Sequence, residues 1–287
     1  MLRICPGLLV MVLGFLAGAC GGDMAAATHV VNLRVLAIRA DPPEVRAPEG
    51  DAVAETSMDA LVVGEEGAVS YSWRLCFVPG IVTDGQPCLD PSTEIALGQG
   101  RSATIPVPSA QLLLAQAPPE LQGFEIDLSS GVPIQVQLDV TDESGRVLTA
   151  LKTILISSRE EPNTNPVLEG LSLDGEPWEA GEIVEVADTA TELEMVPQWP
   201  EAAQEPYDDD GVPTTESLLF SWFIDDETSE LGKARSSEAV PANTFTPGAF
   251  EDDDEEPERL VTLWLVARDD RGGVTWLTRQ LRLVRGE

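Results

Sequence analysis

The stretch from Leu260 to Val284 restricts the fold of this chain more than any other part of the sequence. Its apolar residues recur at every second position on both sides of a turn that reads Asp-Asp-Arg-Gly-Gly. A period of two is the pattern of a strand that has one face buried. Asp and Gly favour tight turns, because Asp bonds nearby backbone amides and Gly accepts a positive φ. The stretch therefore predicts a β-hairpin.

A second copy of this hairpin lies upstream, from Ile134 to Ile156. A shift of 127 residues places Leu265 on Leu138 and Asp269 on Asp142 without a gap. We interpret both Asp residues as turn-capping residues rather than metal ligands, because each one begins a turn. The duplication predicts two domains that are built from the same strands.

The six tryptophans divide into two groups. A Trp inside a strand pattern is expected between two packed sheets. This applies to Trp73 and Trp222, each of which follows a Ser in a strand ahead of its hairpin, and to Trp264. Trp178 and Trp199 lie beside Pro-rich turns and are expected to be exposed. Trp276 follows the final turn, and its environment is left open.

Each copy also opens with a strand that ends in a turn containing Pro and Gly, Leu33–Ile38 in the first copy and Val167–Leu173 in the second. The Ser-Trp strands and the Asp-x-x-Gly hairpins together resemble the immunoglobulin-like and PKD-like β-sandwiches of bacterial surface proteins. The resemblance covers residues 31–287. It implies an all-β fold with two tandem immunoglobulin-like β-sandwich domains.

The repeat also sets the expected domain limits. We expect the first sandwich at residues 31–158, a linker at 159–166 and the second sandwich at 167–287. The link is polar, contains two prolines and follows the first hairpin directly. Such a link is expected to limit the separation of the domains but not their rotation. The first copy is about 22 residues longer than the second between its Trp strand and its hairpin turn.

The N-terminus has the pattern of a secretory signal: a positive charge, an apolar run, and small residues before Cys20. The apolar run is shorter than the ~20 residues that span a bilayer. Leu-Ala-Gly-Ala-Cys resembles a bacterial lipoprotein signal. This resemblance implies removal of residues 1–19, a lipid on Cys20, and a location at the outer membrane or cell surface. Residues 20–30 would then form the lipidated tether. Ordinary cleavage, which would leave a soluble protein with an unmodified Cys20, is the alternative.

Two further cysteines, Cys76 and Cys88, lie in the long segment of the first copy. An even pair in an oxidising compartment predicts a disulfide. Two separate thiols are the alternative. The loop that they enclose is either a binding surface or a stapled insertion without a partner.

The formal net charge of −33 makes nucleic acid a poor partner, because phosphate binding needs clustered Lys and Arg. Two acidic segments, Glu201–Glu216 and Phe250–Glu258, are expected to be solvated loops. Their carboxylates are also candidate Ca²⁺ ligands, although the spacing is not that of an EF-hand. The candidates are Asp208, Asp209, Asp210, Asp252, Asp253 and Asp254. No other cofactor or metal is implied.

The only histidine, His29, lies in the expected tether, outside any expected core. A Ser-His-Asp or Cys-His catalytic site is therefore not expected. We predict a non-catalytic, lipid-anchored cell-envelope protein whose β-sandwich scaffold contacts a protein or a glycan. One alternative is a carbohydrate-active enzyme or its accessory binding module. Another is a calcium-stiffened surface spacer.

Overall fold

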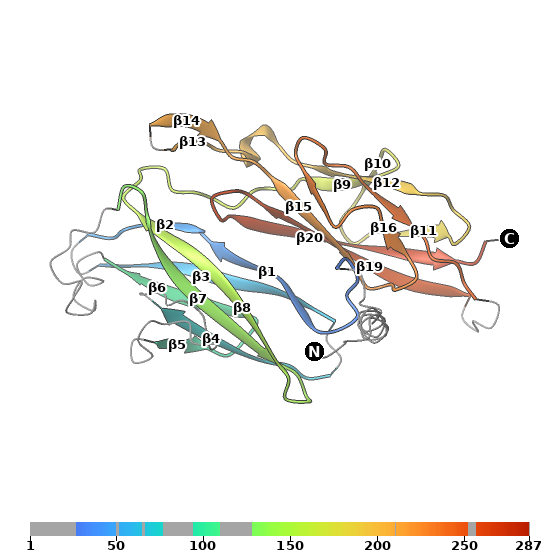
Figure 1. Cartoon of the computed structure of the whole chain (residues 1–287), viewed down its shortest axis with the longest axis horizontal. Coiled ribbons are helices and arrows are strands. Elements are labelled where there is room, and N and C mark those ends of the chain that lie inside the picture. The colour runs from blue at the N-terminus through green and yellow to red at the C-terminus, as the bar shows by residue number, and fades with distance from the viewer. Residues whose placement is uncertain are drawn as a thin grey trace, which may run out of the picture.

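The computed structural model describes residues 27–49, 52–64, 67–76, 94–109, 128–209, 211–251 and 257–286. The fold is all-β, and the two predicted immunoglobulin-like sandwiches lie side by side (Figure 1). Each sandwich has its own apolar core. The expected signal peptide, Cys20 and Cys88 fall outside the described residues. Within the described ranges, no helix has the length and apolar content to cross a membrane.

The first sandwich consists of a three-stranded sheet, β1-β3-β6, packed on a five-stranded sheet, β2-β8-β7-β4-β5. Strand β2 runs parallel to β8, whereas the other strand pairs are antiparallel. The chain therefore changes sheets between β1 and β2. The strands are β1 (Arg34–Asp41), β2 (Glu44–Arg46), β3 (Val53–Val63), β4 (Ser70–Cys76), β5 (Ile95–Gly98), β6 (Ser102–Pro108), β7 (Val132–Thr141) and β8 (Val147–Ser157).

The second sandwich repeats this plan with the sheets β10-β9-β12-β18-β16 and β11-β20-β19-β15-β17. Strand β11 runs parallel to β20, as β2 does to β8. A two-stranded hairpin, β13-β14, projects from it. The elements are β9 (Gly170–Leu173), β10 (Glu176–Trp178), β11 (Ile183–Ala187), β12 (Leu193–Gln198), a 3₁₀ turn (Glu201–Ala203), β13 (Pro206–Asp209), β14 (Val212–Thr215), β15 (Leu219–Ile224), β16 (Glu230–Leu231), β17 (Arg235–Ser237), β18 (Asn243–Thr246), β19 (Glu258–Arg268) and β20 (Val274–Val284).

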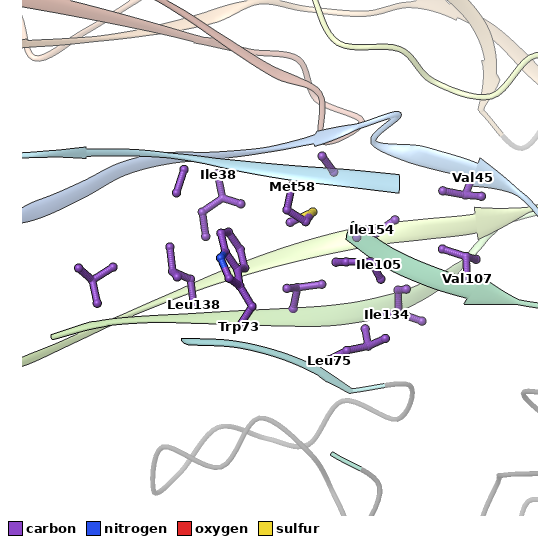
Figure 2. Close-up of a cluster of buried hydrophobic side chains, with 14 of the residues drawn as sticks. Ile38, Val45, Met58, Trp73, Leu75, Ile105, Val107, Ile134, Leu138 and Ile154 are labelled. Atoms are coloured by element: carbon purple, nitrogen blue, oxygen red, sulfur yellow. The ribbon is translucent and has the colours of Figure 1, made fainter. Parts of the chain in front are cut away.

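The register of the sheets confirms the internal repeat. Trp73 lies opposite Leu138 in the first sandwich, and Trp222 lies opposite Leu265 in the second. Both indole rings are fully buried, and Trp73 packs between the two sheets (Figure 2). Each ring nitrogen also has an acceptor, which for Trp73 is the carbonyl oxygen of Gly100 at 2.8 Å. The two Trp strands therefore have equivalent places in the two cores, as predicted.

The two hairpin turns are capped by Asp, as the sequence predicted. In the first turn, Asp142 Oδ1 accepts hydrogen bonds from the backbone amides of Ser144, at 2.9 Å, and Arg146, at 3.0 Å. In the second turn, Asp269 Oδ1 accepts one from the amide of Gly273 at 2.7 Å. The carboxylates therefore satisfy turn amides that have no partner in the β ladder.

The expectation that Trp178 is exposed was wrong. It is 2% exposed and belongs to the second core, because β10 pairs with β9 and turns the ring inward. Trp199 is half-buried, with its ring centroid 5.2 Å from that of Phe220. Trp276 is also half-buried, under the guanidinium of Arg39.

The acidic segment 201–216 is not the solvated loop that was expected. It contains the 3₁₀ turn and the β13-β14 hairpin, and its last residue, Glu216, is 2% exposed. The second acidic segment is described only in part. Phe250 lies 4.6 Å from the guanidinium of Arg259, and Glu258 begins β19. The density of acidic residues in the sequence therefore did not predict which carboxylates are solvated and which are buried.

The start of the described chain is docked on the second sandwich, which corrects the expectation of a tether through residue 30. The amide of Val30 donates to the carbonyl oxygen of Ile224 at 2.7 Å, and the amide of Ile224 donates to that of Thr28 at 2.9 Å. His29 Nε2 lies 2.8 Å from the carbonyl oxygen of Ser229. Residues 28–30 thus pair in parallel with the end of β15, and His29 is part of the folded body.

Candidate functional site

A third apolar cluster joins the two sandwiches. It combines the outer face of β1 and β3 with the outer face of β19 and the start of β20. Strand β19 is therefore buried on both faces. Val261, Leu263, Leu265 and Ala267 enter the second core, and Trp264 and Val266 enter the junction. The buried members of the junction are Val30, Leu36, Ala37, Leu61, Val63, Trp264, Val266 and Val274.

The matching face of the first sandwich is polar. The repeat places Trp264 on Gln137 and Val266 on Asp139. Asp139 forms an ion pair with Arg74, which also pairs with Glu94 at 3.3 Å. The apolar outer face is thus confined to one copy of this strand. This asymmetry favours a closed pair of sandwiches over an open array of repeated domains.

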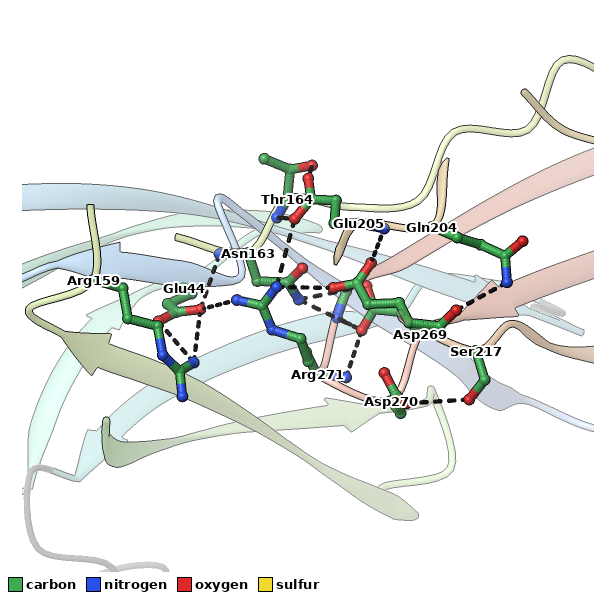
Figure 3. A network of polar contacts seen from close by, with 12 residues as sticks. Glu44, Arg159, Asn163, Thr164, Gln204, Glu205, Ser217, Asp269, Asp270 and Arg271 are labelled. Carbon is green, nitrogen blue, oxygen red and sulfur yellow. Dashed lines mark hydrogen bonds and ion pairs between the residues drawn. The ribbon is translucent and has the colours of Figure 1, made fainter. Parts of the chain in front are cut away.

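A polar cluster centred on Arg271 lies at one end of the junction (Figure 3). Arg271 Nη2 lies 2.8 Å from Glu44 Oε2 of the first sandwich. Arg271 Nη1 lies 3.2 Å from Glu216 Oε1 and 3.7 Å from Glu205 Oε2 of the second. The guanidinium carbon also lies 4.9 Å from the ring centroid of Tyr207. One cation from the last hairpin turn therefore holds carboxylates of both domains.

Glu44 is the anion of the first sandwich in this cluster, and its residue is 1% exposed. Arg159 Nη1 lies 3.2 Å from its Oε1, and the amide of Asn163 donates to its Oε2 at 2.9 Å. Burial alone would raise the pKa of Glu44. Hydrogen bonds from Ser157 and Asn163, with the charges of Arg159 and Arg271, outweigh burial and lower it. Glu44 is thus a fixed negative charge at neutral pH.

Glu216 behaves in the opposite way. Burial, together with the negative charges of Asp269 and Glu205, raises the pKa of Glu216 to about 7, although the Glu205 amide and Arg271 act against the rise. Burial likewise raises the pKa of Asp269, against hydrogen bonds from Gly273, Asn163 and Arg271 and the charge of Lys152. The negative charge of Asp269 therefore opposes the ionisation of Glu216.

Two cations cross the junction in opposite directions to bind backbone carbonyl oxygens. Lys152 of β8 donates to the carbonyl oxygen of Gly272 in the second sandwich. Arg268 of β19 donates to the carbonyl oxygen of Leu36 in the first, at 2.8 Å. Burial lowers the pKa of Lys152 to about 8; Asp269 opposes this change and Arg268 adds to it. The last hairpin turn is thus tied to the first sandwich on both sides.

The link between the domains is part of the junction rather than a free connection. Asn163 is fully buried, and its side-chain amide lies 3.4 Å from Asp269 Oδ2. Asn165 donates to the carbonyl oxygen of Ala40 at 2.7 Å and accepts from the amide of Val274 at 2.9 Å. Asn165 therefore bridges both sandwiches. The expectation that the link leaves rotation free was wrong, because these bonds fix its backbone to both sides.

A groove of about 840 Å³ opens above the Arg271 cluster. Residues at the end of the first sandwich form one wall, and the β13-β14 hairpin forms the other. Its lining includes Arg159, Glu160, Glu161, Tyr207, Asp208 and Thr214. The groove thus combines an aromatic ring with carboxylates and hydroxyl groups where the two domains meet.

The residues singled out from the sequence as site candidates lie mostly elsewhere. Cys76 is fully buried at the end of β4. Cys88 and Cys20 lie outside the described residues, so the disulfide and the lipid stay predictions. Asp208 accepts a hydrogen bond from the amide of Gly211 at 2.5 Å, which is a turn contact.

Calcium binding also stays a prediction. The side chains of the other candidates, Asp209, Asp210, Asp252, Asp253 and Asp254, fall outside the description. Among the described side chains, no three His, Cys, Asp or Glu groups are placed to hold a metal ion.

Sequence reasoning missed the residues of the junction. One signal was present: the run from Trp264 to Ala267 is apolar without interruption, as expected of a strand that is buried on both faces. A second signal was Arg271, because the first copy has Ser144 at the matching position of its turn. Glu44, Glu216 and Lys152 carried no local signal, because their contacts with Arg271 and Gly272 join residues far apart in sequence.

No protein-family model matches the chain, and no curated protein sequence matches it either. Solved structures with similar architecture include an adhesin described as Ca²⁺-stabilised, with which an Antarctic bacterium binds ice. The identity is 10% and the TM-score 0.26, over 88% of this chain and 50% of that one. The chain thus spans about half the length of the adhesin.

Two further structures are a periplasmic chaperone, SfaE, and cadherin domains 3–6 of protocadherin gamma B2. The chaperone has 11% identity and a TM-score of 0.24, over 87% of this chain and 100% of that one. The cadherin fragment has 16% identity and a TM-score of 0.24, over 85% of this chain and 49% of that one. Similarity at this level extends to the β-sandwich class alone.

Proposed function

We propose that the protein is a non-catalytic scaffold of the cell envelope that presents two sandwiches as one rigid body for contact with a protein or a glycan. The proposal includes a lipid anchor on Cys20. The observation that carries it is the junction, in which an apolar cluster, a buried charge cluster and the link all connect the same two domains. These contacts keep the loops of the two sandwiches in fixed positions relative to each other.

The docked N-terminus would keep a lipid on Cys20 close to this body. Thr28 and Val30 are hydrogen-bonded to Ile224, so a chain anchored at Cys20 would reach the folded body at about Ala27. The seven Cα-to-Cα steps from Cys20 to Ala27 can span at most roughly 25 Å. A lipid on Cys20 would therefore keep the junction near the membrane surface, because the docked segment joins both sandwiches.

The groove above Arg271 is the contact surface that we favour. Arg271 lies over the Tyr207 ring, so the ring offers its remaining surface to a sugar face or an apolar side chain. Glu160, Glu161 and Asp208 offer acceptors for hydroxyl or amine groups. The guanidinium groups of Arg159 and Arg271 are already paired with carboxylates. The groove therefore suits neutral or cationic partners better than anionic ones.

Binding and turnover should be measured on the same preparation of the exported chain. We expect saturable binding to a glycan or a purified envelope protein, without turnover in a panel of glycoside hydrolase assays. Thr214→Arg fills the groove and should weaken binding at least tenfold. Val240→Arg is the matched control, because Val240 is 59% exposed and is not part of the groove lining. Catalytic turnover of a glycan would refute the proposal.

The anchor has a separate test. Cells grown with an alkyne fatty acid should label the wild-type protein, whereas a Cys20→Ser variant should remain unlabelled. An intact mass of the exported protein without added acyl groups would contradict the anchor and would leave the rigid scaffold untouched.

A further inference from the structure

The Arg271 cluster contains one more carboxylate than it has cations. Its carboxylates are Glu44, Glu205, Glu216 and Asp269, and its cations are Arg159, Arg271 and Lys152. Of the four carboxylate residues, Glu44, Glu216 and Asp269 are at most 7% exposed. A buried surplus charge is costly, because water cannot stabilise it there. The geometry therefore favours a bound proton.

The surplus negative charge lies on a carboxylate of the second sandwich. Glu44 has two guanidinium partners and a backbone amide, so its charge is balanced. Glu205 and Glu216 both face Arg271 Nη1, and Arg271 already binds Glu44 through its other terminal nitrogen. Asp269 accepts hydrogen bonds from the amides of Arg271 and Gly273 and from Asn163, and the charge of Lys152 acts on it as well. Among the described residues, Glu216 accepts hydrogen bonds from the Glu205 amide and from Arg271 alone, and it shares that guanidinium nitrogen with Glu205. It is thus the buried carboxylate of the cluster with the fewest donors.

The cluster gathers charged groups from each element that meets here. The turn between β19 and β20 contributes Asp269 and Arg271. Asp270 and Arg268 flank the cluster with one charge of each sign, which leaves the surplus at one carboxylate. The segment before β13 contributes Glu205, strand β2 contributes Glu44, strand β8 contributes Lys152, and the segment after β8 contributes Arg159. Since these elements belong to both sandwiches, a change in the charge of one group acts on the junction between them.

We propose that this cluster is a proton-operated latch between the two sandwiches. One bound proton balances the surplus carboxylate and keeps the junction closed, and loss of that proton as the pH rises loosens it. The latch goes beyond the proposed function, because it requires neither a lipid on Cys20 nor a partner in the groove.

The direction of the pH effect follows from Glu216. Its pKa in the closed junction is about 7, above the ordinary value of 4.5. The closed form therefore holds a proton that the open form releases between these two pH values. The stabilisation is fully present below about pH 4.5 and is lost as the pH rises through about 7. The closed-to-open ratio can fall up to about tenfold per pH unit within this window.

The third apolar cluster limits the size of the response. Trp264, Val266 and Leu36 carry no titratable group, so their packing persists when the proton leaves. We therefore expect local opening around the latch rather than separation of the sandwiches. The first sandwich provides an internal comparison, because its equivalent turn has Ser144 in place of Arg271.

Amide hydrogen exchange of the intact chain tests the latch. The amide of Asn163 donates to Glu44, and the amide of Val274 donates to Asn165, so both report on the junction. After correction for the intrinsic pH dependence of exchange, protection of peptides that contain them should fall at least tenfold between pH 5.5 and 8. Peptides of the turn between β7 and β8, around Ser144, should keep constant protection because this turn lies outside the cluster.

Two variants separate the latch from a general effect of pH. Glu216→Gln cannot ionise, so its junction protection should remain constant across this range. Glu192→Gln removes one charge at an exposed position and should behave as wild type does. Parallel profiles for Glu216→Gln and wild type would overturn the proposal.

A third variant keeps the test decisive if Glu216→Gln does not fold. Glu205→Gln removes a negative charge that faces the same guanidinium nitrogen. Glu216 should then ionise more readily, and the midpoint of the protection loss should move to lower pH. An unchanged midpoint would contradict a shared proton.

Discussion

Replacement of Trp264 by Gln tests whether the two sandwiches unfold as one unit. The repeat aligns Trp264 of β19 with Gln137 of β7. The substitution therefore gives the second sandwich the residue that the first sandwich already has at this position. Trp264 is 9% exposed and belongs to the junction cluster rather than to the second core. The change should therefore weaken the junction and leave both cores intact.

The size of the effect follows from the buried area. A buried Trp removes about 150–250 Å² from water, worth roughly 4–6 kcal/mol at about 25 cal/mol per Å². Gln retains part of this contact, so we expect a loss of about 3 kcal/mol, near the lower end for large-to-small substitutions. A loss of this size is a large fraction of the stability of a typical domain.

Urea denaturation followed by circular dichroism measures the outcome. Wild type should unfold in one transition, because the junction couples the two cores. Trp264→Gln should unfold in two transitions, as each sandwich keeps its own core. Leu260→Gln is the matched control on the same strand, because Leu260 is 51% exposed. A Trp264→Gln protein that unfolds in one transition at the wild-type midpoint would refute the reasoning.

Three further predictions concern the charges and the cysteines. Arg271→Met should lower the free energy of unfolding by about 3–5 kcal/mol in urea titrations, because Glu44 stays buried without one of its cations. A loss below about 1 kcal/mol, which is typical of a solvent-exposed ion pair, would contradict this. Burial lowers the pKa of Lys152 to about 8 from the ordinary 10.5, so the folded protein releases this proton first and is stabilised as pH rises between these values. Lys152→Met should flatten that rise in melting temperature, and a slope equal to wild type would exclude Lys152 as its source. Cys76 and Cys88 should resist alkylation in the denatured, unreduced protein, and two modified thiols would rule out their disulfide.

The sequence was sufficient for the strand plan of each sandwich. The period of two and the shift of 127 residues predicted strands whose register places Trp73 against Leu138 and Trp222 against Leu265. Turn chemistry was equally local, because Asp142 and Asp269 bond amides within four residues of themselves. Structural features that depend on residues close together in the sequence could therefore be predicted without a structure.

The junction could not be predicted in the same way, because its contacts link residues far apart in sequence. Glu44 and Arg271 are 227 positions apart. Glu216 lies in an acidic segment whose composition indicates a solvated loop, but contacts with Gln204, Glu205 and the distant Arg271 place it in a buried position. Trp178 shows the same limit, since the pairing of β10 with β9, rather than the nearby Pro and Gly, decides where its ring lies.

A distance measurement between the two sandwiches tests the central claim, that they form one rigid body, most directly. Spin labels at Val147→Cys and Val240→Cys would occupy positions that are 53% and 59% exposed, one on each sandwich. Pulsed electron–electron double resonance on the exported chain should give a single narrow distribution of the distance between the two labels. A broad distribution, as given by two domains that rotate about a free link, would contradict the account.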